Sequence, residues 1–382
     1  MRSSIPLITV LGIPIRLSFS WFLTLAFVVF ILGDQVYPEW LPDSAASTIW
    51  LLALVSGLLF FASILLHELA HSLVARAYGI PVKSITLFIF GGVAHITKEA
   101  SRPFVEFVMA LAGPATSIML SGLFLFLWWV VGFGNEEPVT VMMEWLLVMN
   151  LSIALFNLAP GFPLDGGRVL RSVLWGALGD FRRATFLACW CGRLIAYALI
   201  LGGAATLVFN VSWLGPLSGL WFILIGFFLE GAARQSWTQL KVLEFLRTQK
   251  AGDVMSRDFR AVPKWVALQD LGQEIGGSPL GLYLLVTDND RVVGVLSGEQ
   301  LRAVPRDEWR TATVSTAMKP SSQVSIVGPE TDLATALQAM EGEETRYAPV
   351  VENGHLVGLL SRDAIMRLIM GQRILKPWTV TG

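Results

Sequence analysis

The sequence is short of charge. Only 15% of its 382 residues are Asp, Glu, Lys or Arg, and 54% are hydrophobic, whereas soluble domains carry about 25% charged residues. This balance excludes an ordinary water-soluble protein and indicates a membrane protein. The formal net charge is −1 and no basic face or tail stands out, so we expect no nucleic-acid partner.

Cysteine is nearly absent, and the two residues that occur are Cys189 and Cys191. On the helix expected there, side chains two residues apart point to different sides. The pair therefore suits neither a disulfide with each other nor a zinc pair, and packing is the expected role.

Long apolar runs, by contrast, are abundant, and each can cross the hydrocarbon core of a bilayer as a helix. No small-x-small cleavage site follows the first run, so we expect a retained span rather than a cleavable signal. Six spans are predicted, at about 17–36, 48–76, 103–133, 141–158, 185–209 and 213–229.

The loop charges orient these spans. Lys and Arg lie before the first span and after the second, fourth and sixth, while the alternate loops hold acids or no charge. The positive-inside rule then places both termini in the cytoplasm.

One apolar stretch between the second and third spans is too short to be a span. Residues 85–96 are β-prone and are interrupted by Gly91-Gly92, so two short strands with a tight turn fit them better. Open strand edges are not tolerated against lipid, so this hairpin must line a protein cavity or lie at the interface. Residues 8–16 predict a further short strand or turn.

The second span ends in His67-Glu68-Leu69-Ala70-His71, an H-E-x-x-H pattern. Four residues apart on a helix, His67 and His71 project from one face and can bind one zinc ion. Glu68 lies close enough to take a proton from water activated by that ion. Two imidazoles and a carboxylate are costly at the end of a membrane span, and a metal gives a reason for them.

A catalytic zinc takes a third protein ligand. Asp165 follows another inward-running span and arrives at a similar depth. Its competing interpretation is as the N-cap of the helix that follows. His95 lies on the predicted hairpin and stays open as an alternative ligand.

From about residue 250 the chain has the charge density of a soluble domain. A weak internal repeat relates residues 253–256 to 316–319 and residues 292–297 to 356–361. Each copy ends in a β-like run that turns through Gly-x-x-Ser into a helical stretch. We predict two α/β units in tandem.

Several motifs in the first 235 residues can be compared with known families. They are H-E-L-A-H at 67–71, Gly91-Gly92-x-Ala94, Gly113-Pro114-x-x-Ser117 and Asn157-x-x-Pro160-x-x-x-Leu164-Asp165-Gly166. Together they resemble the site-2 protease family of intramembrane zinc metalloproteases. The remainder resembles a tandem pair of CBS domains, so the chain is similar to the branch typified by the sporulation protease of spore-forming bacteria.

The resemblance implies a role for each matching residue. His67, His71 and Asp165 would bind zinc, one ion per chain, with Glu68 as general base. Asn157 would hold the substrate or the oxyanion. The strand that pairs with the substrate backbone would comprise Gly91, Gly92, Val93, Ala94, His95 and Ile96.

The implied activity is hydrolysis of a peptide bond within or near a transmembrane segment, as in regulated intramembrane proteolysis. The family's substrates include membrane-tethered transcription factors, anti-sigma factors and remnant signal peptides. The expected location is a bacterial cell membrane, with the CBS domains on the cytoplasmic side.

The CBS pair has two open interpretations. Versions that bind adenine nucleotides such as ATP tend to end Gly-h-h-Ser/Thr-x-x-Asp. Ser297 and Ser361 match the hydroxyl, whereas Asp363 is one residue early and the first unit has Gln300 at the last position. Nucleotide binding near these residues and a dimerising or substrate-docking module, with a homodimer as its product, both stay open.

The predicted fold class is a polytopic α-helical membrane protein of six spans, with a short membrane-embedded β-hairpin and a cytosolic α/β tandem CBS domain. The predicted domains are a protease domain at 1–235, a linker at 236–250, a CBS pair at 251–372 with units at about 251–305 and 313–372, and a tail at 373–382. The alternative is a CBS-regulated transporter or channel, which explains the spans and the tail. It does not explain why H-E-x-x-H and Leu-Asp-Gly are expected at the same depth in the membrane.

Overall fold

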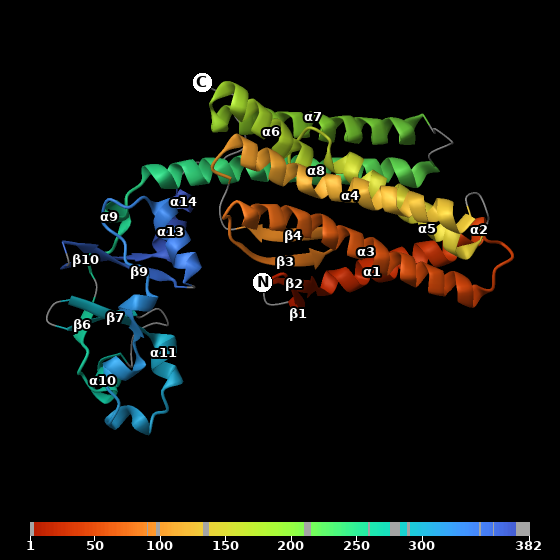
Figure 1. The fold of residues 1–382 in the computed structure, drawn as a ribbon. Coiled ribbons are helices and arrows are strands. Elements are labelled where there is room, and N and C mark those ends of the chain that lie inside the picture. The colour runs from red at the N-terminus through yellow and green to blue at the C-terminus, as the bar shows by residue number, and fades with distance from the viewer. Residues whose placement is uncertain are drawn as a thin grey trace. The chain divides into compact units, whose positions relative to one another are not determined.

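The chain forms two compact units, Met1–Trp237 and Thr238–Gly382 (Figure 1). The computed structural model describes residues 4–89, 91–96, 100–132, 137–209, 215–258, 260–275, 283–288, 291–343, 345–353 and 355–371. The expected tail at 373–382 lies outside the described residues.

Helices make up most of the first unit. They are α1 (Phe19–Ile31), α2 (Tyr37–Trp40), α3 (Ala46–Ala77), α4 (Pro103–Gly132), α5 (Pro138–Asn157), α6 (Asp165–Leu178), α7 (Phe181–Val208) and α8 (Gly215–Thr248), and α8 continues into the second unit. A π-helix, Leu32–Val36, joins α1 to α2.

Five stretches of the described residues are long and apolar enough to cross a membrane: Phe19–Trp40 and the helices α3, α4, α5 and α7. They coincide with the first five expected spans. The sixth expected span, at 213–229, begins outside the described residues and continues in α8. The count of six spans therefore stays a prediction.

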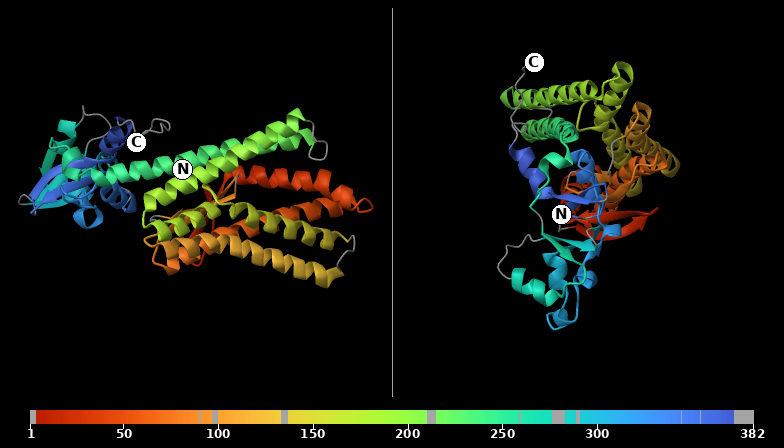
Figure 2. Two further views of the ribbon diagram at one scale, coloured as in Figure 1. Left: turned by 90° about the horizontal axis from the view of Figure 1, so that it is seen from above. Right: turned by 90° about the vertical axis from the view of Figure 1, so that its left-hand side faces the viewer.

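The exposed faces of these helices are apolar. Leu23, Met119 and Leu201 are 71%, 75% and 69% exposed, as expected for side chains that face lipid. Within the unit, α3, α4 and α5 lie side by side (Figure 2). They share an apolar core that includes Leu52 and Leu146.

A four-stranded sheet accompanies the helices, in the order β1-β2-β3-β4. The strands are β1 (Ser4–Val10), β2 (Ile13–Ser18), β3 (Val82–Phe88) and β4 (Gly91–Ile96). β2 and β3 run parallel, and the other two neighbouring pairs are antiparallel. β4 lies at the edge of the sheet.

This sheet is larger than the lone hairpin expected at 85–96, because β2 pairs with the free edge of β3. Ile13 is fully buried and packs with Leu69 of α3 and Ile85 of β3. The addition of β2 gives hydrogen-bond partners to an edge that lipid could not satisfy. The alternation of apolar and polar residues in β2 is short and follows Gly12. The local pattern therefore indicated only a short strand or turn.

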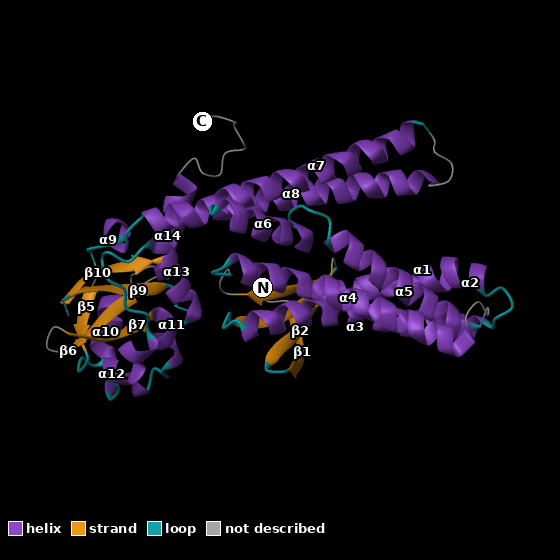
Figure 3. Ribbon diagram, turned by 45° about the horizontal axis from the view of Figure 1, so that its top comes forward, coloured by secondary structure: helices purple, strands orange, loops and turns teal. Residues whose placement is uncertain are grey.

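The second unit consists of short helices and strands (Figure 3). In chain order they are α9 (Ala251–Val254), β5 (Arg260–Pro263), α10 (Leu268–Ile275), β6 (Tyr283–Asp288), β7 (Arg291–Ser297), α11 (Gly298–Ala303), α12 (Val314–Ala317), β8 (Lys319–Pro320), α13 (Leu333–Gly342), β9 (Tyr347–Glu352), β10 (His355–Ser361) and α14 (Arg362–Gly371). The order of the first six elements recurs in the last six, which matches the internal repeat.

The two repeats exchange their first segments. Met255, just after α9, lies against Gly358 of the second repeat. Met318, just after α12, lies against Gly294 of the first, where an added Cβ would be 2.8 Å from the Met318 sulfur. The expected units at 251–305 and 313–372 are thus interleaved.

The expected linker at 236–250 is mostly helical, because α8 continues to Thr248. Val242, Phe245 and Leu246 pack into an apolar core of the second unit. The boundary between the compact units falls after Trp237, near the start of that linker.

Candidate metal centre

Three side chains of the kinds that can bind a metal meet where α3 passes the start of α6. Nε2 of His67 and Nε2 of His71 are 3.2 Å apart, and each lies 3.1 Å from Oδ2 of Asp165. Both histidines are 4% exposed. Within the described part of the chain, these three residues form the one group of His, Cys, Asp and Glu side chains placed to hold an ion.

The second nitrogen of each ring is held by α4. Nδ1 of His71 lies 2.6 Å from the carbonyl oxygen of Met109, which can only accept, so Nδ1 carries the proton. Nδ1 of His67 pairs with the hydroxyl of Ser117 at 2.9 Å. A neutral His71 then presents a lone pair at Nε2 to the Asp165 carboxylate, and a metal ion between them would satisfy both groups.

Zinc fits this donor set. Tetrahedral zinc with bonds of about 2.0–2.1 Å separates its ligand atoms by about 3.4 Å. The three separations here are 3.1–3.2 Å. Two imidazoles and a carboxylate with a fourth position open to water or substrate form the donor set of many catalytic zinc sites. His67, His71 and Asp165 are the residues that would hold the ion.

Asp165 is the first residue of α6, and Leu164 occupies the N-cap position. The Asp165 carboxylate faces the histidines, so its contacts match the ligand interpretation rather than the cap. A side chain at Gly166 would collide with the carbonyl oxygens of Leu158 and Ala159. The glycine after Asp165 therefore allows α6 to begin close to the end of α5.

Glu68 lies between the two histidines in the sequence and contacts β4. The backbone N–H of Ala94 donates a hydrogen bond to its carboxylate. A Cβ at Gly92 would collide with Cγ of Glu68, so the absence of a side chain at Gly92 allows this approach. The predicted general base and the edge strand are thus in direct contact.

Asn157 and His95 are predicted site residues that do not belong to the cluster of three. Asn157 ends α5, and its side-chain amide donates to the carbonyl oxygen of Ile153 at 3.0 Å. His95 lies on β4, half-buried, and is not one of the three clustered groups. The roles of both residues stay predictions.

Gly113 and Ser117 are supporting residues that were not among the predicted site residues. A Cβ at Gly113 would collide with Nε2 of both histidines, so this glycine makes room for the centre. Both belong to the motif Gly113-Pro114-x-x-Ser117. That motif is the sequence signal for them, but their contact with α3 requires the packed helices.

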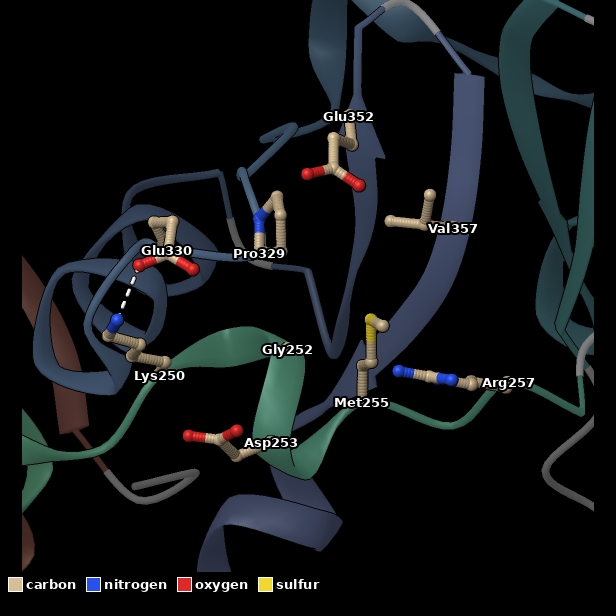
Figure 4. Close-up of a pocket in the computed structure, with 9 residues that line it drawn as sticks. All are labelled: Lys250, Gly252, Asp253, Met255, Arg257, Pro329, Glu330, Glu352 and Val357. Atoms are coloured by element: carbon tan, nitrogen blue, oxygen red, sulfur yellow. Dashed lines mark hydrogen bonds and ion pairs between the residues drawn. The ribbon is translucent and has the colours of Figure 1, made fainter.

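The second unit contains a pocket of about 490 Å³ with charges of both signs (Figure 4). Its charged lining residues are Lys250, Asp253, Arg257, Glu330 and Glu352. Nζ of Lys250 lies 2.5 Å from Oε2 of Glu330, and this carboxylate raises the pKa of Lys250.

The three residues predicted near a nucleotide do not line this pocket. The hydroxyl of Ser297 accepts from the backbone N–H of Gln300, and that of Ser361 from the N–H of Ala364. Both serines thereby cap helices, α11 and α14. Asp363 is exposed in the first turn of α14.

Comparison with known proteins identifies the family of the chain. The model of peptidase family M50 matches residues 56–139 and 134–201, which include all three clustered groups. A zinc metalloprotease, by its name, of Synechocystis sp. is 34% identical over 97% of this chain and 96% of its own length. The chain belongs to peptidase family M50, the site-2 proteases. The protein is therefore a zinc metalloprotease by family.

Other known proteins are also similar to this chain. Rip3 of Mycobacterium tuberculosis, also named as a zinc metalloprotease, is 33% identical over 99% of this chain and 95% of its own length. A solved site-2 protease from Methanocaldococcus jannaschii is 26% identical, with a TM-score of 0.41, and the match covers 61% of this chain and 95% of that one. The CBS domain model matches residues 314–371, so this M50 protein has a C-terminal CBS domain.

Proposed function

We propose that this M50 protein is an intramembrane protease that hydrolyses a peptide bond within or next to a transmembrane segment of a membrane-anchored protein. The observation that carries the proposal is that Asp165, at the start of α6, meets His67 and His71 of α3. The helix α3 is long and apolar enough to span a bilayer. Buried ionisable groups at that position are costly unless they serve a site.

The metal and the residues around it have separate roles in the reaction. Zinc, when bound, supplies a Lewis acid that activates water and polarises the scissile carbonyl. Glu68 takes the proton of the attacking water and gives it to the leaving amine. Asn157 donates a hydrogen bond to the oxyanion, a kind of contact that contributes about 3–4 kcal/mol where it has been measured.

β4 supplies a place for the substrate backbone. A substrate helix satisfies its own N–H and C=O groups, so its scissile bond is hidden until the helix unwinds. The residues from Gly91 to Ile96 form an edge strand beside Glu68. An unwound segment that pairs with this edge regains hydrogen bonds and lies beside the general base.

Substitution Glu68→Gln tests the proposal. The variant removes the proton acceptor but leaves the three metal-binding groups, so we expect proteolysis to be lost while most of the zinc is retained. Zinc content and cleavage of a membrane-anchored reporter are measured in parallel. A transporter or channel would show neither zinc nor cleavage in the wild-type protein, and this result would reject the proposal.

We propose in addition that the CBS unit regulates the protease through an adenine nucleotide. Arg257 of the pocket supplies positive charge for a phosphate group. Binding of ATP to the full-length protein in detergent should be saturable and weaker in Arg257→Ala. A flat titration would reject nucleotide binding and favour the dimerising or substrate-docking module.

A further inference from the structure

A buried ion pair joins α4 to α6. Nε of Arg171, on α6, donates to Oε1 of Glu106, on α4, at 2.7 Å, and Nη2 contacts the same oxygen. Glu106 is 1% exposed and Arg171 is 8% exposed. The charges of the pair are therefore almost fully removed from water.

Two aromatic rings enclose the guanidinium of Arg171. Its Cζ lies 4.9 Å from the centroid of the Phe162 ring and 4.6 Å from that of Phe181. Phe162 comes three residues before Asp165. Arg171 thus contacts the loop that leads to the third metal-binding group, while its own backbone belongs to the helix that begins with that group.

The other partner is near the support of His71. Glu106 precedes Met109 by three residues on α4, and the Met109 carbonyl oxygen accepts a hydrogen bond from Nδ1–H of His71. One ion pair therefore links the part of α4 that orients His71 with the helix that carries Asp165. These two segments are distant in the sequence and must keep a fixed separation for the three ligand atoms to meet.

Stability alone does not account for the pair. Removing two charges from water costs several kcal/mol per ion, and apolar replacements of similar volume are often as stable or more stable. In the described part of the chain, Oε2 of Glu106 is buried with no hydrogen-bond partner, so the pair is not fully compensated. A role in fixing the separation of α4 and α6 would explain why a charged pair is buried at this position.

We propose that Glu106 and Arg171 are positioning residues that hold Asp165 at the right distance from His67 and His71, and so determine zinc affinity. The inference rests on the proposed zinc-dependent function. It predicts an effect on metal binding itself, and not only on turnover.

The double variant Glu106→Leu/Arg171→Met tests this role, because it removes both charges and leaves no unpaired ion. Zinc affinity of the purified full-length protein in detergent is measured by competition with a chelator, and helical content by circular dichroism. We expect native helical content and zinc binding weakened by about 10–100-fold, the range found when groups that orient metal ligands are lost.

The chain offers a matched control in the same unit. Nε of Arg193, on α7, lies 3.4 Å from Oε1 of Glu230, on α8, and the guanidinium of Arg193 lies over the Trp190 ring. The other side-chain partners that the structure describes for this pair, Tyr197 and Arg234, also lie on α7 and α8. Glu230→Leu/Arg193→Met should therefore leave zinc affinity unchanged.

Two outcomes would overturn the inference. Unchanged zinc affinity in Glu106→Leu/Arg171→Met would show that the pair is only structural. If that variant does not fold, Arg171→Lys provides the test, because it keeps the charge but loses the planar guanidinium. We expect weaker zinc binding with native helical content. Unchanged zinc affinity would contradict the positioning role. Wild-type protein that binds no zinc would reject the proposed function, and this inference with it.

Discussion

Gly113 occupies the position on α4 that faces both histidines. An alanine there would place a Cβ in collision with Nε2 of His67 and of His71, and the space between the rings is where a metal would be bound. In Gly113→Ala we expect zinc to be lost, measured as zinc per chain in purified protein. Gly122→Ala, on the same helix, is the control, because its Cβ meets no atom within 4 Å. A Gly113→Ala protein with a full complement of zinc would contradict the described geometry.

Gly92 limits a different step. A Cβ at this position would collide with Cγ of Glu68 and lie 3.2 Å from its Cδ, and its three nearest atoms belong to Glu68 and Leu87, not to either histidine. In Gly92→Ala we expect cleavage to fall sharply while zinc content stays at the wild-type level. Turnover of a membrane-anchored reporter and zinc per chain are compared in one preparation. Loss of zinc together with activity would show that β4 supports the metal centre instead of the general base.

At the scale of elements, the relation between α3 and β4 is central. α3 satisfies its backbone internally and can face lipid, whereas β4 is an edge strand with backbone groups that need partners. The hydrogen bond from Ala94 to Glu68 joins the two elements. An extended peptide on this edge would lie beside the carboxylate, whereas a helical peptide could not pair with the edge.

The state of the substrate helix should therefore control the rate. We expect Gly or Pro near the scissile bond of a reporter span to speed cleavage, and a run of Leu and Ala there to slow it, because unwinding precedes strand pairing. Rates are compared at equal reporter abundance in membranes, with Glu68→Gln as the blank. If a stably helical span were cut equally fast, pairing on β4 would not be part of the reaction.

At the scale of the whole molecule, charge in the loops decides orientation. Basic residues before the first span and after the second and fourth predict cytoplasmic loops. In a protein whose Cys189 and Cys191 are replaced by Ser, Asp43→Cys should react with an impermeant maleimide in intact cells, and Ser101→Cys only after permeabilisation. The reverse pattern would place both termini outside.

Much of the first unit follows from local pattern. Apolar runs of span length must become helices in a bilayer because no water is present to satisfy the backbone, and five of the six expected runs are helices that can span. The antiparallel pairing of β3 and β4 could likewise be expected from two short β-prone runs around Gly91-Gly92. The pairing of β2 with β3 could not, because it joins segments separated by all of α1 and α3.

The spacing of His67 and His71 by itself determined that two imidazoles share one face, since i and i+4 are neighbours on any helix. Only the tertiary structure decided what surrounds them: the Asp165 carboxylate, the Ser117 hydroxyl, the space left by Gly113, and the Glu106–Arg171 pair. These contacts join helices that are far apart in the chain, and their distances depend on how whole helices pack. A sequence pattern, which records neighbours along one element, contains no such distances.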